Sequence, residues 1–266
     1  MNELISQLEF DPKNPFDLNV DIVPERFVRN FYNEYLLFCY TSEYETTIIY
    51  PAVLNNLKNK RYEKYIGSLS QSEREQIYQY FEKMINDETE HTDHFSIILN
   101  KMNPQYIDLD LLKHESQLMV ENTDLVKLLS TIYVGECYLW VSFFQIYKTT
   151  TNTNKKYIFK KLLVEESQHN NNILKFLKKI KSTITLTKDE YINDVKKNRL
   201  MNLLHIQKEF KIPNANSVAF KKVLQLVYNN PWHNKFNDLM IKKTYQLCAV
   251  LFPETTFEEF KAAVNG

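Results

Sequence analysis

Two segments of this 266-residue chain repeat one arrangement of glutamate and histidine. Glu88 precedes His91 by three residues, and Glu166 precedes His169 by the same spacing. Residues three apart lie on one face of an α-helix, so each pair can bind one metal ion or two adjacent ions. A single pair of this kind often arises by chance in a charged chain. Two pairs in two helical segments are a much stronger signal, and they predict a metal site inside a helical fold.

A lone glutamate lies in the most apolar segment of the chain. Glu136 is the only charged residue between Leu128 and Trp140. Burying an unpaired carboxylate is costly, so this side chain should reach solvent, meet a cation or bind metal. Because the two glutamate–histidine pairs are also present, we predict that Glu136 binds the same metal ions.

A further long helical segment starts after Pro24 and contains two candidate glutamates, Glu43 and Glu45. Helical steps from either residue lead to largely apolar positions, with a mild preference for the face of Glu45. We predict Glu45 as the sixth ligand and keep Glu43 as the alternative. The predicted metal-binding residues are therefore Glu45, Glu88, His91, Glu136, Glu166 and His169.

The hydrophobic pattern predicts an all-α fold, an antiparallel four-helix bundle with additional C-terminal helices. The long helices are expected at about residues 25–58, 72–100, 123–148 and 155–181, with a short helix near 111–119. Residues 1–23 are expected to form an extended lead-in, 24–182 the bundle, and 183–266 a helical extension packed on it. The extension should contain three or four helices, with breaks at Pro213, at 229–231 and at Pro253. It is compatible with capping the bundle, binding substrate or forming a homodimer.

The sequence also predicts how two of the long helices begin. Ser72 precedes Glu75 by three residues, which is the spacing of a capping box, and Ser70 is a second candidate for the same cap. Asn122 or Thr123 is expected to cap the third long helix.

Composition excludes several classes of protein. Only 3 glycines are present, which argues against glycine-rich phosphate loops and nucleotide-binding folds. The formal net charge of zero gives no reason to expect nucleic acid or a membrane surface as a partner. The three cysteines form no CxxC pair, so no rubredoxin-type iron centre is expected. With no signal peptide and no apolar run long enough for a membrane span, we expect a cytoplasmic protein.

The order glutamate, Glu-x-x-His, glutamate, Glu-x-x-His resembles the ferritin-like di-iron oxygenase superfamily. It is most similar to the p-aminobenzoate N-oxygenase group, in which a first-helix glutamate is followed six residues later by proline, as Glu45 is by Pro51. Asp87, directly before Glu88, also matches that group. The similarity covers about residues 25–175 and leaves the last third of the chain unexplained.

One position departs from this group. Leu162 stands where the N-oxygenases have an additional histidine ligand, and leucine cannot bind metal, so the site is expected to keep six ligands. His94, one turn after His91, is a candidate for a seventh ligand, although we expect it to be an ordinary histidine. His114, His205 and His233 lie outside the motif, and we expect them to be ordinary histidines as well.

The resemblance also implies contacts around the metal ligands. The acidic residue before each Glu-x-x-His glutamate commonly accepts a hydrogen bond from the histidine of the opposite motif. Asp87 would then orient His169, and Glu165 would orient His91. Tyr133, one turn from Glu136, is a candidate to donate a hydrogen bond or relay an electron, although core packing is the role that we expect. A substrate pocket is expected around the rings of Tyr133, Trp140, Phe143 and Phe95.

Four carboxylates and two histidines suit two iron ions, with manganese or a mixed pair as the alternative. The resulting hypothesis is a di-iron oxidoreductase that activates dioxygen to oxidise a small organic substrate, with electrons from an external donor. The outcome would be hydroxylation, N-oxidation, desaturation or oxidative cleavage. The alternatives are an iron storage or detoxification protein and a metal-free helical interaction protein.

Overall fold

The computed structural model describes residues 25–100, 108–149, 153–197 and 231–266. The predicted lead-in and the break at Pro213 lie outside these residues. Throughout the described part of the chain the regular secondary structure is helical, which confirms the all-α prediction. None of the described helices is both long and apolar enough to span a membrane.

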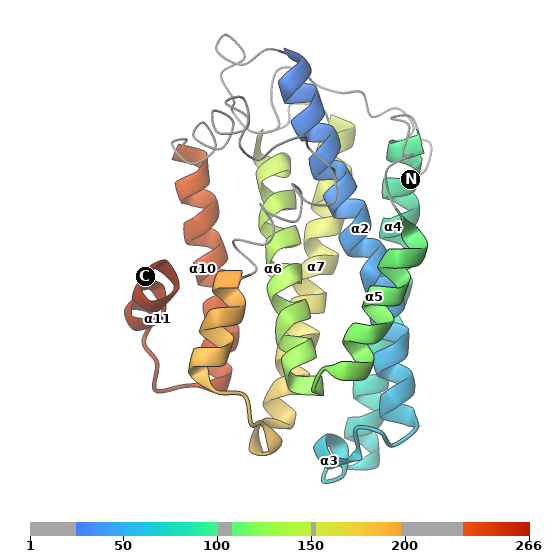
Figure 1. Ribbon diagram of the computed structural model, residues 1–266, viewed down its shortest axis with the longest axis vertical. Coiled ribbons are helices and arrows are strands. Elements are labelled where there is room, and N and C mark those ends of the chain that lie inside the picture. Colours follow the sequence, from blue (N-terminus) through green and yellow to red (C-terminus); the bar gives the residue numbers. More distant parts are fainter. Residues whose placement is uncertain (1–24, 101–107, 150–152, 198–230) are drawn as a thin grey trace.

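Four long helices form the bundle (Figure 1). They are α2 (Glu25–Lys58), α4 (Gln71–Asn100), α6 (Leu125–Thr149) and α7 (Thr153–Lys179). Helix α2 packs on α4, and α6 packs on α7, while α4 and α7 meet across the bundle. Within each of the two packed pairs the helices run in opposite directions. The helices therefore bring residues that are far apart in sequence to one central axis.

The connections decide how the two pairs are joined. The short helix α3 (Glu63–Ile66) lies in the turn between α2 and α4. Helix α5 (Leu109–Asn122) runs back along α2, so that α4 and α6 point the same way in Figure 1. One long return connection of this kind distinguishes a ferritin-like bundle from a simple up-and-down bundle.

Of the two predicted caps of α4, the structure uses Ser70 rather than Ser72, whereas the start of α6 differs from the predicted caps by one or two residues. The capping box of α4 is made by Ser70 and Glu73, because Glu73 N donates to Ser70 Oγ at 3.3 Å and Ser70 N donates to the Glu73 carboxylate at 3.0 Å. The predicted Ser72 lies inside the helix. Asp124 starts α6, since its Oδ1 accepts a hydrogen bond from Val126 N at 2.9 Å. Neither Asn122 nor Thr123 can do this, because α5 continues through Asn122 and ends at its C-cap, Thr123.

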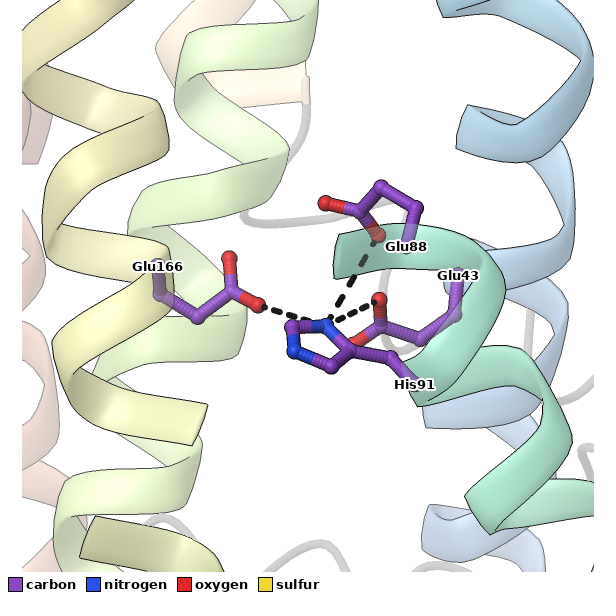
Figure 2. Close-up of side chains that lie close together, drawn as sticks. All are labelled: Glu43, Glu88, His91 and Glu166. Carbon is purple, nitrogen blue, oxygen red and sulfur yellow. Dashed lines mark hydrogen bonds and ion pairs between the residues drawn. The ribbon is translucent and has the colours of Figure 1, made fainter. Parts of the chain in front are cut away.

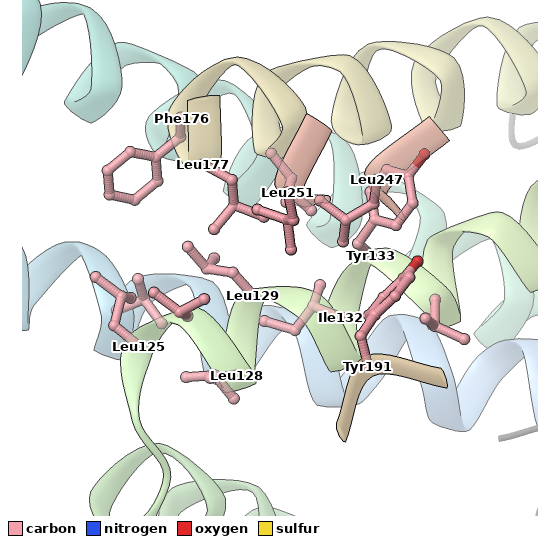
Figure 3. Close-up of a cluster of buried hydrophobic side chains, with 14 of the residues drawn as sticks. Leu125, Leu128, Leu129, Ile132, Tyr133, Phe176, Leu177, Tyr191, Leu247 and Leu251 are labelled. Carbon is pink, nitrogen blue, oxygen red and sulfur yellow. The ribbon is translucent and has the colours of Figure 1, made fainter. Parts of the chain in front are cut away.

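The C-terminal part adds helices to one side of the bundle. After the short 3₁₀ helix η1 (Lys181–Thr183), residues 188–197 are helical. Helix α10 (Pro231–Leu251) packs on α6 and α7, and α11 (Phe257–Asn265) packs on α10. Leu247 and Leu251 of α10 and Tyr191 of the segment 188–197 form one apolar cluster with residues of α6 and α7 (Figure 3). The hydroxyl of Tyr191 donates to the main-chain oxygen of Thr244 at 2.7 Å, which fastens 188–197 to α10.

Phe81 holds the two helix pairs together in the bundle core. Its ring is buried and packs edge-on against Tyr50 of α2 at 5.9 Å and Phe176 of α7 at 6.1 Å, measured between centroids. We expect Phe81→Ala to lower the free energy of unfolding by about 3–5 kcal/mol, because it leaves a cavity that three helices cannot close. Denaturant unfolding checks this. Tyr157→Ala is the matched control, since that ring is 59% exposed and should change stability little.

Candidate metal centre

Six buried side chains meet between the four long helices. Two groups of four have ligand atoms that all lie within 4.8 Å of one another. The first group is Glu43, Glu88, His91 and Glu166, and the second is Glu88, Glu136, Glu166 and His169. Figure 2 shows the first group, with the carboxylates of α2, α4 and α7 surrounding the His91 ring. Because Glu88 and Glu166 belong to both groups, they lie where two adjacent metal ions would be bridged.

Each helix supplies the residues that its sequence spacing assigns to it. Helix α4 provides Glu88 and His91, and α7 provides Glu166 and His169, three residues apart in both cases. Helix α6 supplies Glu136, whose side chain is buried as the apolar sequence around it predicts. Five of the six predicted residues are thus brought together.

The sixth residue is Glu43, and the preference for Glu45 is corrected. Glu43 is fully buried, and its Oε2 lies 3.2 Å from Nδ1 of His91. Glu45 is only half-buried and belongs to neither group. Residues two positions apart in an α-helix point in directions that differ by about 200° around the helix axis. Only one of these two carboxylates can therefore face the bundle axis. Helical steps from Glu43 lead to Cys39 and Tyr50, and the structure shows that both are fully buried, so this face of α2 is the one that packs against the bundle.

This correction predicts a difference between two neighbouring substitutions. Glu43→Ala should reduce the metal bound per chain, because it removes a ligand from the first group. Glu45→Ala should leave the metal content unchanged. Metal analysis of both variants after anaerobic loading with ferrous iron measures this. The reverse pattern, with loss only in Glu45→Ala, would restore the sequence-based choice.

The predicted contacts behind the two histidines are present. His169 Nε2 lies 3.2 Å from Asp87 Oδ2, and His91 Nε2 lies 3.0 Å from Glu165 Oε2. An Nε2–H that donates to an acid leaves Nδ1 with its lone pair directed at the centre of the bundle, where it can bind metal. Burial opposes the ionisation of Asp87, but hydrogen bonds from His169 and Lys83 outweigh it and lower its pKa to about 2.

Two residues of α2 that the sequence did not single out also contact the carboxylates. The phenol of Tyr50 donates a short hydrogen bond to Oε1 of Glu136. The hydroxyl of Thr46 donates to Oε2 of Glu88 at 2.8 Å. Both residues are one or two turns beyond Glu43, on the same face of the helix. If Glu43 rather than Glu45 is placed on the bundle axis, helical spacing predicts that Thr46 and Tyr50 face the same centre.

Tyr133 does not take the role suggested for it. Its hydroxyl donates to the main-chain oxygen of Lys243 in α10 at 3.0 Å. Its ring belongs to the apolar cluster of α6, α7 and α10 (Figure 3). The contact of Tyr133 is with the C-terminal extension, as the core-packing alternative expects, and the tyrosine at the carboxylates is Tyr50.

The four rings expected around a pocket fall into two separate places. Phe95 and Phe143 stack on each other at 5.9 Å between centroids. Trp140 instead lies beneath the ammonium of Lys243, so it faces α10, as Tyr133 does. The role of these four rings around a substrate pocket stays a prediction.

His94 lies outside both metal-binding groups. It is 5% exposed, and its Nε2 is 3.6 Å from a carboxylate oxygen of Glu90. His114 is exposed on α5. His205 lies outside the described residues, as does the side chain of His233.

Burial and mutual repulsion raise the pKa values of two of the four carboxyl groups at the centre. Burial, followed by repulsion from Glu88, raises the pKa of Glu43 well above its usual value. Burial, followed by repulsion from Glu166, raises the pKa of Glu136 to about 8. Burial opposes the charge of His91 and His169, but the surrounding carboxylates outweigh it and raise both pKa values. Without cations, the centre therefore holds protons in their place.

Several of these buried ligand atoms have no hydrogen-bond partner. They are Oε1 of Glu43, Oε2 of Glu136 and both oxygens of Glu166. A buried polar atom left unsatisfied costs about 1–3 kcal/mol, so a cluster of them is a sign of a missing ligand. Two divalent cations would coordinate these atoms and balance the four carboxylate charges. The mixture of oxygen and imidazole donors fits iron or manganese.

Comparison with known proteins agrees with this geometry. Residues 34–138 match the family model described as Rubrerythrin, a family of ferritin-like di-iron carboxylate proteins. The bundle is ferritin-like, and its centre is of the di-iron carboxylate type. The match contains Glu43, Glu88, His91 and Glu136 but ends before α7. It covers less than half of the chain, and it gives no support to the predicted likeness to the N-oxygenase group. No curated protein and no solved structure matches the chain.

Proposed function

We propose that this chain is a di-iron oxidoreductase that reduces dioxygen or hydrogen peroxide. The observation that carries the proposal is the pair of ligand groups that share Glu88 and Glu166, inside a bundle similar to rubrerythrin. When bound, two ferrous ions supply the electrons for such a reduction. Glu43, Glu88, His91, Glu136, Glu166 and His169 would hold them.

The remaining residues around the centre orient the ligands and exclude water. Asp87 and Glu165 fix the two histidine rings through Nε2. Tyr50 and Thr46 each fix one carboxylate oxygen, so the carboxylates face the axis before metal arrives. This order reduces the rearrangement needed on binding. The ligands are at most 2% exposed, which keeps bulk water away from the reaction.

The proposal has two forms, which differ in the substrate. In the first form, the oxidised metal centre would oxidise a small organic molecule by hydroxylation, N-oxidation, desaturation or oxidative cleavage. In the second form, the centre would only reduce peroxide. Peroxide needs less room than an organic substrate, and the buried rings of Phe95, one turn after His91, and Phe143, two turns after Glu136, stack on each other. We therefore favour peroxide as the substrate. Product analysis with and without an added amine or hydrocarbon separates the two forms.

Anaerobic reconstitution with ferrous iron, followed by metal analysis, tests the metal centre itself. We expect about two irons per chain, one for each ligand group, and a much lower content in Glu136→Ala. The reduced protein should then be oxidised by hydrogen peroxide or dioxygen, with a change in its near-ultraviolet absorption.

Two other outcomes would replace the proposal. Less than one iron per chain, unchanged by Glu136→Ala, would indicate a helical protein without a metal function. Many irons per chain together with a large oligomer on gel filtration would indicate iron storage.

A further inference from the structure

Electrons must reach a centre that no reductant can touch. The carboxylates and histidines are buried, and the chain has no CxxC pair to hold an iron centre of its own. Tyr50 and Tyr133 are also fully buried, so neither ring can meet a donor at the surface. An electron from outside therefore has to cross the protein, and a ring that is both accessible and close to the ligands is the best place to begin.

Trp140 meets both conditions. It lies on α6, one helical turn after Glu136, and it is only partly buried. Its indole Nε1–H donates to Oγ of Ser167 on α7 at 2.7 Å. Ser167 directly follows Glu166, one of the two residues shared by both ligand groups. One ring at the edge of the bundle is thus connected to two metal-binding helices.

The surroundings of the ring fix its position and its charge. The Lys243 ammonium of α10 lies 3.7 Å from the Trp140 ring centroid, which is close for a cation–π contact. Phe144 stacks on Trp140 at 5.2 Å between centroids, with an angle of 9° between the ring planes. A fixed positive charge disfavours an oxidised, cationic indole, because like charges repel. The same charge attracts an anionic donor.

We propose that Trp140 is the point at which electrons enter the metal centre, and that Lys243 favours a negatively charged electron donor. This inference rests on the proposed function. With two ferric ions bound, two molecules of a one-electron reductant would each give up one electron, and each would be oxidised in turn. Trp140 keeps its N–H proton, which remains hydrogen-bonded to Oγ of Ser167, and forms no covalent bond. Its part is to shorten the path between the donor and the ligands.

The test is the rate at which the oxidised, iron-loaded protein is reduced in the absence of dioxygen and peroxide. Two reductants of opposite charge are compared by stopped flow: dithionite, which is anionic, and reduced methyl viologen, which is cationic. Trp140→Leu should be reduced severalfold more slowly by both. Trp140→Phe keeps an aromatic ring and should recover part of the rate.

The Lys243 variant separates charge from packing. Lys243→Met should slow reduction by dithionite severalfold and make it less sensitive to salt, but should speed reduction by methyl viologen, because the charge that repels this cationic donor is gone. Lys242→Met is the matched control, because that neighbouring side chain is exposed. It should change neither rate. A loss of packing alone would change the rates of reduction by the two reductants to the same extent, whatever the charge of the reductant.

The outcomes distinguish this inference from the proposed function. If the unmodified protein binds no iron, the proposed function fails first. If it binds iron and is reduced normally, but Trp140→Phe, Trp140→Leu and Lys243→Met are all reduced at the original rates, the inference is wrong. Should Trp140→Leu lose its iron, the rates of Trp140→Phe and Lys243→Met decide the matter.

Discussion

Glu166→Ala is expected to abolish binding of both metal ions. Glu166 belongs to both ligand groups, and its two oxygens have no hydrogen-bond partner, so its loss removes a ligand from each metal position. The iron content after anaerobic loading should fall from about two per chain to well below one. This is a larger effect than that of Glu43→Ala, because Glu43 belongs to the first group only.

The control for this substitution is Glu82→Ala. Glu82 is a half-exposed residue of α4 that pairs with Lys58 at 2.8 Å, so its loss should leave metal binding unchanged. Circular dichroism of both variants checks that the helices remain. If Glu166→Ala keeps two irons per chain and its helices, the assignment of the shared ligand is wrong.

The metal-free protein should lose stability as the pH rises from about 5 to about 8. Glu136 has its pKa raised from 4.5 to about 8, first by burial and then by repulsion from Glu166. A carboxyl with a raised pKa keeps its proton in the folded state, so stability falls as pH rises from the unfolded pKa to the folded one. The window for Glu136 is therefore pH 4.5 to about 8.

The two histidines act in the same direction. Burial opposes their charge, but the nearby carboxylates outweigh it and raise the pKa values of His91 and His169 well above 6.5. Their stabilisation is fully present below pH 6.5 and is lost as the pH rises through the folded-state values. Asp87 and Glu166 have lowered pKa values, so the stability that they contribute is lost only at acidic pH. Above about pH 5 the net trend is therefore downward.

Guanidinium unfolding of chelator-treated protein at several pH values measures this trend. Glu136→Gln cannot ionise, so it should flatten the dependence. Loading with cobalt(II) should raise the melting temperature more at alkaline than at acidic pH, because metal binds the deprotonated ligands. A free energy of unfolding that increases between about pH 5 and pH 8 would contradict the buried, charge-repelling centre.

The sequence was most informative where chemistry depends on local spacing. Glu88 and His91 share a helix face because they are three residues apart, and this holds in any straight helix. The isolation of Glu136 among apolar residues predicted its burial, because an apolar helix has few ways to reach solvent. The contacts of Asp87 and Glu165 also followed from their places beside the motif glutamates.

The sequence was least informative where two helix faces looked alike. Glu43 and Glu45 both have apolar neighbours, so periodicity alone gave only a mild preference, and that preference was wrong. The rotation of α2 about its axis is fixed by the packing of Cys39, Tyr50 and Val53, which are all fully buried against other helices. Such packing depends on residues from elsewhere in the chain.

The same limit applies to the aromatic residues. Tyr133 is one turn from Glu136 on α6, yet it contacts α10, whereas Tyr50 reaches Glu136 from another helix. Trp140 gained its contacts only because α7 supplies Ser167 and α10 supplies Lys243. Spacing along one helix cannot predict which neighbouring helix a side chain will meet.

The sequence by itself determined the helical fold class, five of the six residues at the centre and the kind of metal they suit: four residues came from the duplicated Glu-x-x-His motif, and Glu136 came from its apolar surroundings. These follow from helix geometry and from the cost of burying charge, which act locally. The tertiary structure alone decided that Glu43 completes the set, that Glu88 and Glu166 are shared, and that Tyr50 joins them. These depend on how helices rotate and pack against one another, and that is a property of the whole core.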